Sequence, residues 1–207
     1  NPAILAGAVF TMGDAYTKEN KPEEAIAIYE KAQSVLSDNE DFLNRLANLY
    51  NMKMLNDKAA KIYEKLASLR PDNIMYIQML SNTLNSAGKK DEAAAIWKKL
   101  AADKHKDANI LSQAANFFSN ANDMEQAIGL MEKVVGLDAN NMGYTQSLAT
   151  MYTRAEKADK AEALLKKILE TAKDSWLKDW ANNELLNIYQ KQNKLDELAK
   201  TYEADIK

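Results

Sequence analysis

A spacing of 34 residues recurs along the chain and limits what it can fold into. Frames of this length begin at Ala6, Glu40, Ile74, Ala108 and Met142. Counted from the first residue of each frame, position 8 is always small and position 20 is always alanine: Gly13, Ala47, Ser81, Ala115 and Ala149, then Ala25, Ala59, Ala93, Ala127 and Ala161. Such a period is typical of repeat proteins, in which each repeat packs on its neighbours.

Positions 7, 11 and 24 of the frame carry mostly large, apolar residues. Positions 4, 7, 8 and 11 follow the spacing of one helical face, and positions 20, 24 and 27 do the same for a second helix. Small residues at positions 8 and 20 let the two backbones approach, while large residues at 11 and 24 fill the space between pairs. Positions 7, 11 and 24 read Met12, Leu46, Leu80, Ala114 and Leu148; Tyr16, Tyr50, Leu84, Phe118 and Tyr152; Tyr29, Tyr63, Trp97, Met131 and Leu165.

The composition favours helices throughout. Glycine (6) and proline (3) are scarce, and good helix formers dominate. Pro22 suits the first turn of a second helix, where its missing N–H costs nothing. Pro71 suits the break between two repeats.

These positions together resemble the tetratricopeptide repeat (TPR) family, and the resemblance covers essentially the whole chain. It implies an all-α fold, a right-handed α-solenoid of about six helix-turn-helix units. It also implies a non-enzymatic scaffold for protein–protein interaction, since this family supplies binding surfaces for many unrelated partners.

We expect one array over residues 1–207. Its repeats are predicted at 6–39, 40–73, 74–107, 108–141, 142–175 and 179–207, with 176–178 as an insertion and 1–5 as the tail of a possible preceding repeat. In the sixth repeat Leu186 and Leu198 replace the small residues of positions 8 and 20, and Tyr202 occupies position 24. The last helix pair should therefore be splayed, and we expect a fragment of a longer or processed protein.

A second stripe, at positions 5, 9 and 12, faces away from the second helix and should line the concave groove. In frames two to six all fifteen residues are polar and uncharged: Asn44, Asn48, Asn51, Gln78, Asn82, Asn85, Ser112, Asn116, Ser119, Gln146, Thr150, Thr153, Asn183, Asn187 and Gln190. Because 28% of the chain is charged, an ordinary solvated helix face should carry Glu and Lys.

The favoured interpretation is a groove that binds an extended peptide. A carboxamide carries both a donor and an acceptor, so it can pair with a peptide backbone without recognising side chains. The stripe is similar to the asparagine ladder of peptide-binding TPR arrays such as the O-linked N-acetylglucosamine transferase repeat domain. The predicted contacts are Asn48, Asn82, Asn116 and Asn187, flanked by Asn44, Asn51, Gln78, Asn85, Ser112 and Gln146. Alternatively, the amides only bond to neighbouring helices and water. Asp14 replaces asparagine in frame one.

Several other functions find little support. A formal net charge of −3 with mixed signs does not suggest nucleic-acid binding, and no apolar run approaches the roughly 18–20 residues that span a membrane. His105 is the only histidine and is expected at the surface, and no catalytic motif, cofactor site or metal site is evident. Position 5 is Phe10, Asn44 and Gln78 in the first three frames, so a lysine-based carboxylate clamp is not expected.

Two rival functions stay open: self-association or structural use of the array within a larger multi-repeat protein, and carbohydrate binding by the amides. Trp176 and Trp180 lie four residues apart around the insertion. One of them is expected to cap the last apolar face as part of the core, and a contact surface formed by both is the alternative. The chain has no cysteine, which leaves the compartment of this soluble protein open between cytoplasm and periplasm.

Overall fold

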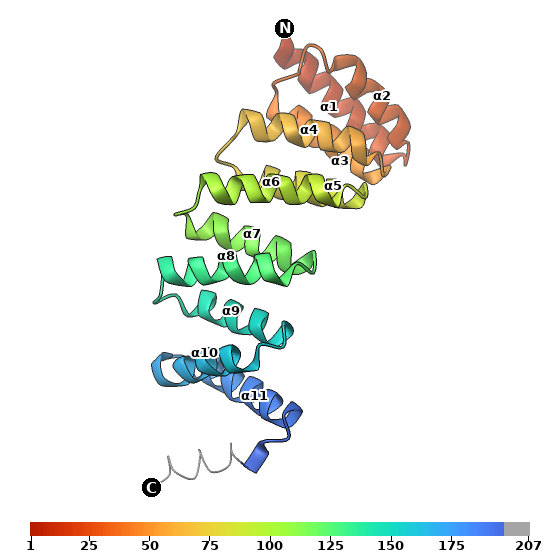
Figure 1. Ribbon diagram of the computed structural model, residues 1–207. Coiled ribbons are helices and arrows are strands. Elements are labelled where there is room, and N and C mark those ends of the chain that lie inside the picture. Colours follow the sequence, from red (N-terminus) through yellow and green to blue (C-terminus); the bar gives the residue numbers. More distant parts are fainter. Residues whose placement is uncertain (197–207) are drawn as a thin grey trace. The chain divides into compact units, whose positions relative to one another are not determined.

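A computed structural model describes residues 1–196. Within that range it contains eleven α-helices and no strand (Figure 1). The helices are α1 (Pro2–Lys18), α2 (Pro22–Ala32), α3 (Glu40–Met52), α4 (Asn56–Leu69), α5 (Ile74–Ser86), α6 (Lys90–Asp103), α7 (Ala108–Asn120), α8 (Met124–Leu137), α9 (Met142–Arg154), α10 (Ala158–Thr171) and α11 (Ser175–Lys191). The predicted all-α fold of helix pairs is confirmed.

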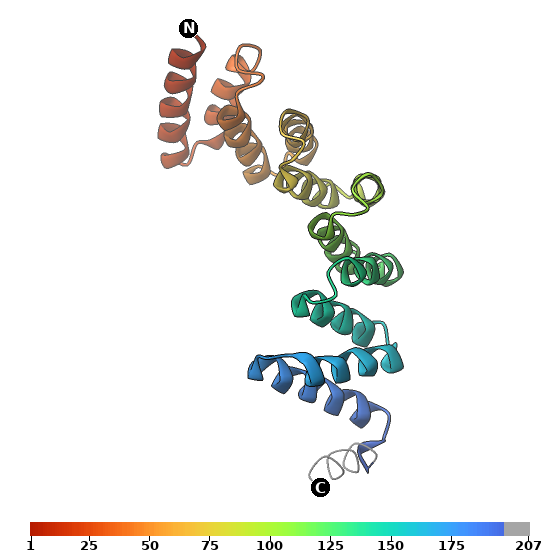
Figure 2. The same cartoon turned by 90° about the vertical axis from the view of Figure 1, so that its left-hand side faces the viewer.

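The chain divides into two compact units, Asn1–Lys98 and Lys99–Lys207, and the boundary falls inside α6. In the first unit α1 packs on α2, α2 on α3, α3 on α4 and α4 on α5. In the second unit the same succession runs from α7 to α11. Short turns join consecutive helices in both units (Figures 1 and 2).

The predicted core positions are buried. All five alanines of position 20 have no exposed surface, and Ala47, Ala115 and Ala149 of position 8 have none either. The aromatic and aliphatic residues of position 24 are at most 2% exposed. Met12 is the exception among the position 7 residues, at 48% exposed. Helices α3, α5 and α9 each pack against the second helix of the preceding repeat, whereas no described helix precedes α1 to cover Met12.

Both ends of the first helices are capped by the sequence. The residue before α3, α5, α7 and α9 is Asn39, Asn73, Asp107 and Asn141, and each side chain accepts a backbone N–H of the first turn. At the other end the N–H of position 16 donates to the carbonyl of position 11, as in Leu55 to Tyr50 (2.8 Å). This is the Schellman motif, which requires a left-handed residue at position 15.

The residues predicted as an insertion, 176–178, lie within a helix. They lie in the first turn of α11, which has 17 residues where α3, α5, α7 and α9 have 13. Residues 2–5 continue directly into α1. The predicted splaying of the last pair depends in part on Leu198, which lies outside the described residues, as does Tyr202.

A hydrogen-bonded cluster joins neighbouring repeats at two equivalent places, three frames apart. In the first unit the Tyr50 hydroxyl and Lys58 Nζ both donate to Glu30 Oε1, at 2.9 and 2.8 Å. In the second unit the matching residues are Tyr152, Lys160 and Glu132, which make the same two bonds. Each cluster ties a second helix to the repeat that follows it.

These clusters predict an acid-sensitive contribution to stability. The pKa of Glu30 is lowered mainly by the hydrogen bond from Lys58, and that of Glu132 mainly by the bond from Tyr152. Because each folded-state pKa lies below the unfolded value of about 4.3, the contribution is complete above that pH. It is lost as the pH falls through the folded-state pKa.

We therefore expect Glu30→Gln to lower the free energy of unfolding by about 0.5–1 kcal/mol at pH 7, the modest size reflecting solvent screening of a partly exposed pair. Urea denaturation from pH 7 down to pH 2 should show the difference from wild type shrinking as Glu30 is protonated. Asp72→Asn, at an exposed carboxylate of the α4–α5 turn, is the control. A difference that stays constant down to pH 2 would exclude a role for the ionised carboxylate.

Candidate functional site

The polar stripe lies on α3, α5, α7, α9 and α11, and the structure separates its members by exposure. All five residues of position 9 are exposed: Asn48, Asn82, Asn116, Thr150 and Asn187. At positions 5 and 12 exposure varies. Gln78 and Asn51 are exposed, Asn44, Asn85 and Gln146 are half-buried, and Ser112 and Ser119 are buried.

Several stripe residues already bond within the protein. Asn44 Nδ2 donates to the Tyr76 hydroxyl (2.9 Å), and that hydroxyl donates to Glu40 Oε1 (2.6 Å). Asn51 Nδ2 donates to the Tyr63 hydroxyl (3.0 Å). The hydroxyl of Ser112 donates to the carbonyl of Asn109 in its own helix (2.8 Å). In each of these residues at least one polar group of the side chain is therefore already paired within the protein, as the alternative interpretation of the stripe predicts.

The asparagines of position 9 behave differently. Among the described residues the side chains of Asn82, Asn116 and Asn187 make no hydrogen bond, while Asn48 Oδ1 accepts one long bond from the Tyr63 hydroxyl (3.5 Å). Thr150 donates to the carbonyl of Gln146 one turn earlier (3.0 Å). A hydroxyl can be satisfied by its own helix in this way, whereas these carboxamides point donor and acceptor groups to solvent.

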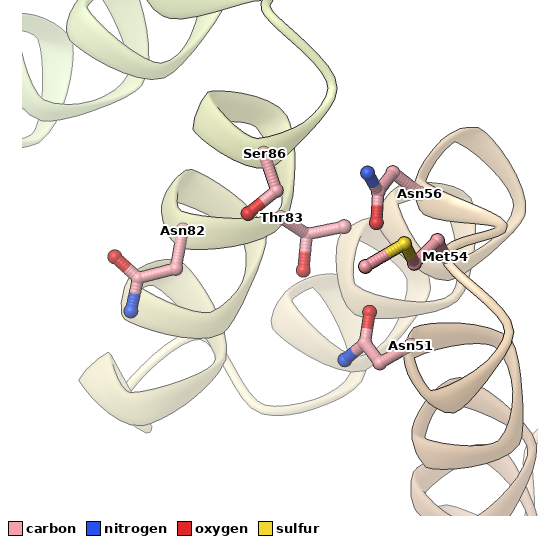
Figure 3. A pocket seen from close by; sticks show the side chains of 6 residues that line it. All are labelled: Asn51, Met54, Asn56, Asn82, Thr83 and Ser86. Carbon is pink, nitrogen blue, oxygen red and sulfur yellow. The ribbon is translucent and has the colours of Figure 1, made fainter.

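Shallow hollows lie beside this row of amides. The hollow of the first unit, between the α3–α4 turn and α5, has a volume of about 370 Å³ and an uncharged lining: Asn51, Met54, Asn56, Asn82, Thr83 and Ser86 (Figure 3). In the second unit, one between α7 and α9 includes Asn116, Gln146 and Arg154, and another beside α11 includes Glu156 and Lys191. The lining is thus neutral in the first unit and carries charges in the second.

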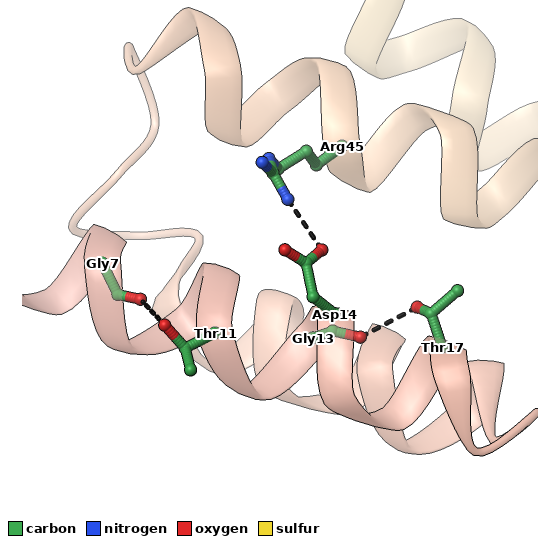
Figure 4. Close-up of polar contacts among 6 residues, drawn as sticks. All are labelled: Gly7, Thr11, Gly13, Asp14, Thr17 and Arg45. Carbon is green, nitrogen blue, oxygen red and sulfur yellow. Dashed lines mark hydrogen bonds and ion pairs between the residues drawn. The ribbon is translucent and has the colours of Figure 1, made fainter.

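Two arginines near the stripe form hydrogen bonds to neighbouring side chains. Arg45 Nη1 donates to Asp14 Oδ1 (2.8 Å; Figure 4), and its guanidinium lies 4.6 Å from the ring centroid of Phe10. Asp14, the acidic residue that replaces asparagine at position 9 of frame one, therefore has a cationic partner. Arg154 Nη1 donates to the Ser119 hydroxyl (2.7 Å), which joins α9 to α7.

The two tryptophans near the start of α11 differ in exposure. Trp176 is 60% exposed, and Trp180 is half-buried. Trp176 belongs to the turn by which α11 exceeds the other first helices, so it does not occupy a core position of the frame. His105 is exposed in the α6–α7 loop, as predicted.

Residues 1–196 contain neither a cluster of metal-binding side chains nor a membrane-spanning helix. Across this range no group of three or more His, Cys, Asp or Glu side chains could hold a metal ion. None of the helices in it combines the length and apolarity that a membrane span requires.

The comparisons with known proteins fit this geometry. A family model of the tetratricopeptide repeat matches residues 6–35, which contain most of α1 and all of α2. The solved structure of MamA from Desulfovibrio magneticus RS-1, from residue 41 to its end, aligns over 80% of this chain and 94% of its own, with 19% identity and a TM-score of 0.51. Residues 6–35 thus match the TPR family, and the chain shares the fold of TPR arrays. No curated protein sequence matches it.

Two further solved structures share the TPR fold with this chain. A second MamA structure has 19% identity and a TM-score of 0.53, over 80% of this chain and 91% of its own. YrrB, described as a TPR protein with an unusual peptide-binding site, has 19% identity and a TM-score of 0.51, over 84% of this chain and 90% of its own. TPR arrays use extended surfaces of stacked helices to bind protein partners.

Sequence reasoning missed one feature of this TPR surface. Met54 lies in the hollow of the first unit and has a positive φ of 54°. The signal was available in position 15 of the frames, which reads Asn20, Met54, Gly88, Asn122 and Glu156. Three of these five residues are glycine or asparagine, which adopt a positive φ readily, so Met54 and Glu156 stand out as unusual.

Proposed function

We propose that this TPR array is a protein-interaction scaffold that holds an extended peptide segment of a partner against the exposed amides of its first helices. Asn48 and Asn82 serve the first unit, and Asn116 and Asn187 serve the second. The observation that carries the proposal is the exposure of these four carboxamides on helices where Lys or Glu would be expected. Three of them have no intramolecular hydrogen bond within the described chain.

The chemistry of a carboxamide suits a peptide backbone. Each amide offers an N–H donor and a C=O acceptor, which match the C=O and N–H that an extended segment presents. Such recognition tolerates different side chains in the partner. In the first unit the uncharged lining makes ion pairing a minor component, so binding there should weaken little with salt.

The proposal is tested by quantitative affinity capture with the intact chain and with an Asn48→Ala/Asn82→Ala/Asn116→Ala variant. Each lost hydrogen bond is worth about 1 kcal/mol, so the dissociation constant of a bound partner should be on the order of 100-fold higher for the variant. Alanine favours helices more than asparagine does, and circular dichroism should confirm that the variant is folded.

Thr150→Ala is the matched control, because it removes a position 9 side chain whose hydroxyl bonds to its own helix. Its capture profile should equal that of wild type. Partners retained equally by the triple variant would rule out the amides as the binding surface.

Self-association is a second candidate with its own observation. Ile4 is 73% and Met12 48% exposed on α1, whereas Leu46, the counterpart of Met12 on α3, is fully buried. An exposed apolar helix face can pair with a second copy. Light scattering should then show a mass that rises with concentration and that Met12→Glu abolishes. A mass independent of concentration would exclude this candidate.

A further inference from the structure

Six turns of the chain share a backbone conformation that most residues avoid. The residue two places after the end of each first helix has φ between 54° and 80°: Asn20, Met54, Gly88, Asn122, Glu156 and Asn193. Glycine and asparagine enter this left-handed region readily, and other residues do so at a cost in folding free energy. Four of the six turns have glycine or asparagine. Met54 and Glu156 are the exceptions.

Met54 also has the most exposed large apolar side chain in residues 1–196, at 83%. A methionine that is neither buried nor conformationally favoured contributes little to folding. Strained residues of this kind are concentrated at functional sites, where their position serves binding. The surroundings of Met54 show what it would bind.

The Met54 side chain lies in the hollow between the α3–α4 turn and α5. It extends between the amides of Asn56 and Asn51 toward Thr83 (Figure 3). The bond from Asn51 Nδ2 to the Tyr63 hydroxyl holds that amide in place, since Tyr63 is only 2% exposed. The hollow therefore has a flexible thioether on one side and a fixed polar group beside it.

The charges next to Met54 in the chain are paired. Lys53 binds Glu23 Oε1 at 2.5 Å, and Asp57 binds Lys89 Nζ at 2.7 Å. With an uncharged lining and ion-paired neighbours, the hollow offers no counter-charge to an acidic or basic ligand group. Its chemistry suits an uncharged side chain flanked by backbone amides.

We propose that the hollow binds one apolar side chain of the extended segment, and that Met54 is the residue that selects it. This inference rests on the proposed function, because Asn48 and Asn82 would hold the adjacent backbone. A methionine thioether is flexible and polarizable, so it adapts to aliphatic and aromatic groups. Apolar surface buried against it supplies the preference.

The second unit contains a natural contrast. Its equivalent hollow, beside α11, has Glu156 in place of Met54 and includes Lys191. Charged groups there would be desolvated by an apolar side chain, which is unfavourable. Met54→Glu should therefore remove the preference of the first unit for apolar groups.

The test uses synthetic peptides Ser-Thr-Ser-X-Ser-Thr-Ser, with X as Leu, Phe, Asn or Glu, added to the intact chain labelled with ¹³C at the methionine methyl groups. The Leu and Phe peptides should shift the Met54 methyl signal and bind about tenfold more tightly than the Asn peptide, as expected for one buried aliphatic side chain. The Met12 signal, from α1, should not move. In Met54→Gly the Leu-to-Asn ratio should fall to about one.

Met54→Gly also tests the strain directly, because glycine accepts the positive φ. We expect it to raise the Tm by about 2–4 °C, so lost binding cannot be attributed to unfolding. Preference for Leu that survives in Met54→Gly would overturn the inference. So would the absence of any Met54 shift at about 1–3 mM peptide, the weakest affinity that would still count as binding.

The Asn48→Ala/Asn82→Ala variant separates the two proposals. If it binds every peptide more weakly but keeps the tenfold preference for Leu, both proposals hold. If it binds every peptide as tightly as wild type while Met54→Gly loses the preference, the role of the amides fails and that of Met54 stands. If it binds more weakly while Met54→Gly keeps the preference, the amides stand and Met54 fails.

Discussion

Replacing Tyr29 with alanine is expected to lower the free energy of unfolding of the Asn1–Lys98 unit by about 3–5 kcal/mol. Tyr29 lies on α2 and is 2% exposed. Its ring stacks on Phe10 of α1 and Phe42 of α3, with centroid separations of 6.3 and 5.2 Å. Removing the ring leaves a cavity where three helices meet, and the surrounding helices can only partly close it.

Native-state hydrogen exchange is the appropriate measurement, because a repeat array need not unfold as a whole. Amides of α1 to α3 should exchange faster in Tyr29→Ala, while those of α8 to α11 should be unaffected. Tyr29→Phe retains both ring stacks and should cost about 1 kcal/mol or less. Equal losses in the two variants would show that the ring itself is unimportant.

Gly13→Ala should destabilise the same unit by about 1–3 kcal/mol, although alanine is the better helix former. A Cβ at Gly13 would overlap Cε2 of Tyr29 and lie 3.3 Å from both Cζ and the hydroxyl oxygen. The ring cannot easily move, because it stacks against both Phe10 and Phe42. Position 8 must therefore carry the smallest residue in this repeat.

Gly7→Ala is a closely matched control. Both glycines lie in α1, and the carbonyl of each accepts a hydrogen bond from a threonine four residues later, Thr11 or Thr17 (Figure 4). A Cβ at Gly7 would meet nothing within 4 Å. This variant should gain about 0.5–1 kcal/mol from helix propensity alone.

A double-mutant cycle identifies the cause of the Gly13 effect. In the Tyr29→Ala background the obstructing ring is gone, so Gly13→Ala should become stabilising by about 0.5–1 kcal/mol. Thermal and urea denaturation of the four proteins would measure the coupling. Additive effects would show that the clash is not what makes alanine unfavourable at this position.

Much of the fold follows from residues that interact locally. The alanines of position 20 and the small residues of position 8 permit close helix pairing, and the Asn and Asp N-caps mark where first helices begin. Pro22 begins α2 and Pro71 lies between α4 and α5, as predicted. These signals act within one repeat, so they are visible without knowledge of packing.

The candidate site was harder to predict, because it depends on contacts between repeats. Helical spacing predicted fifteen polar residues on one face, but in the structure some of them are exposed, some half-buried and some buried. Ser119 is buried because Arg154 of the next repeat reaches it, and Asn44 is half-buried against Tyr76. A helical period gives the direction of a side chain but not the length or conformation of the neighbour that covers it.

The sequence alone determined the helix pairs, their 34-residue spacing and the chemistry of the polar stripe, since each depends on residue type at a fixed interval. The tertiary structure decided which amides stay exposed to solvent and which bond to tyrosines of neighbouring helices. It also placed Met54 in a hollow between the turn that precedes α4 and the helix α5 of the following repeat. That juxtaposition arises from packing between repeats, and a single 34-residue frame does not contain it.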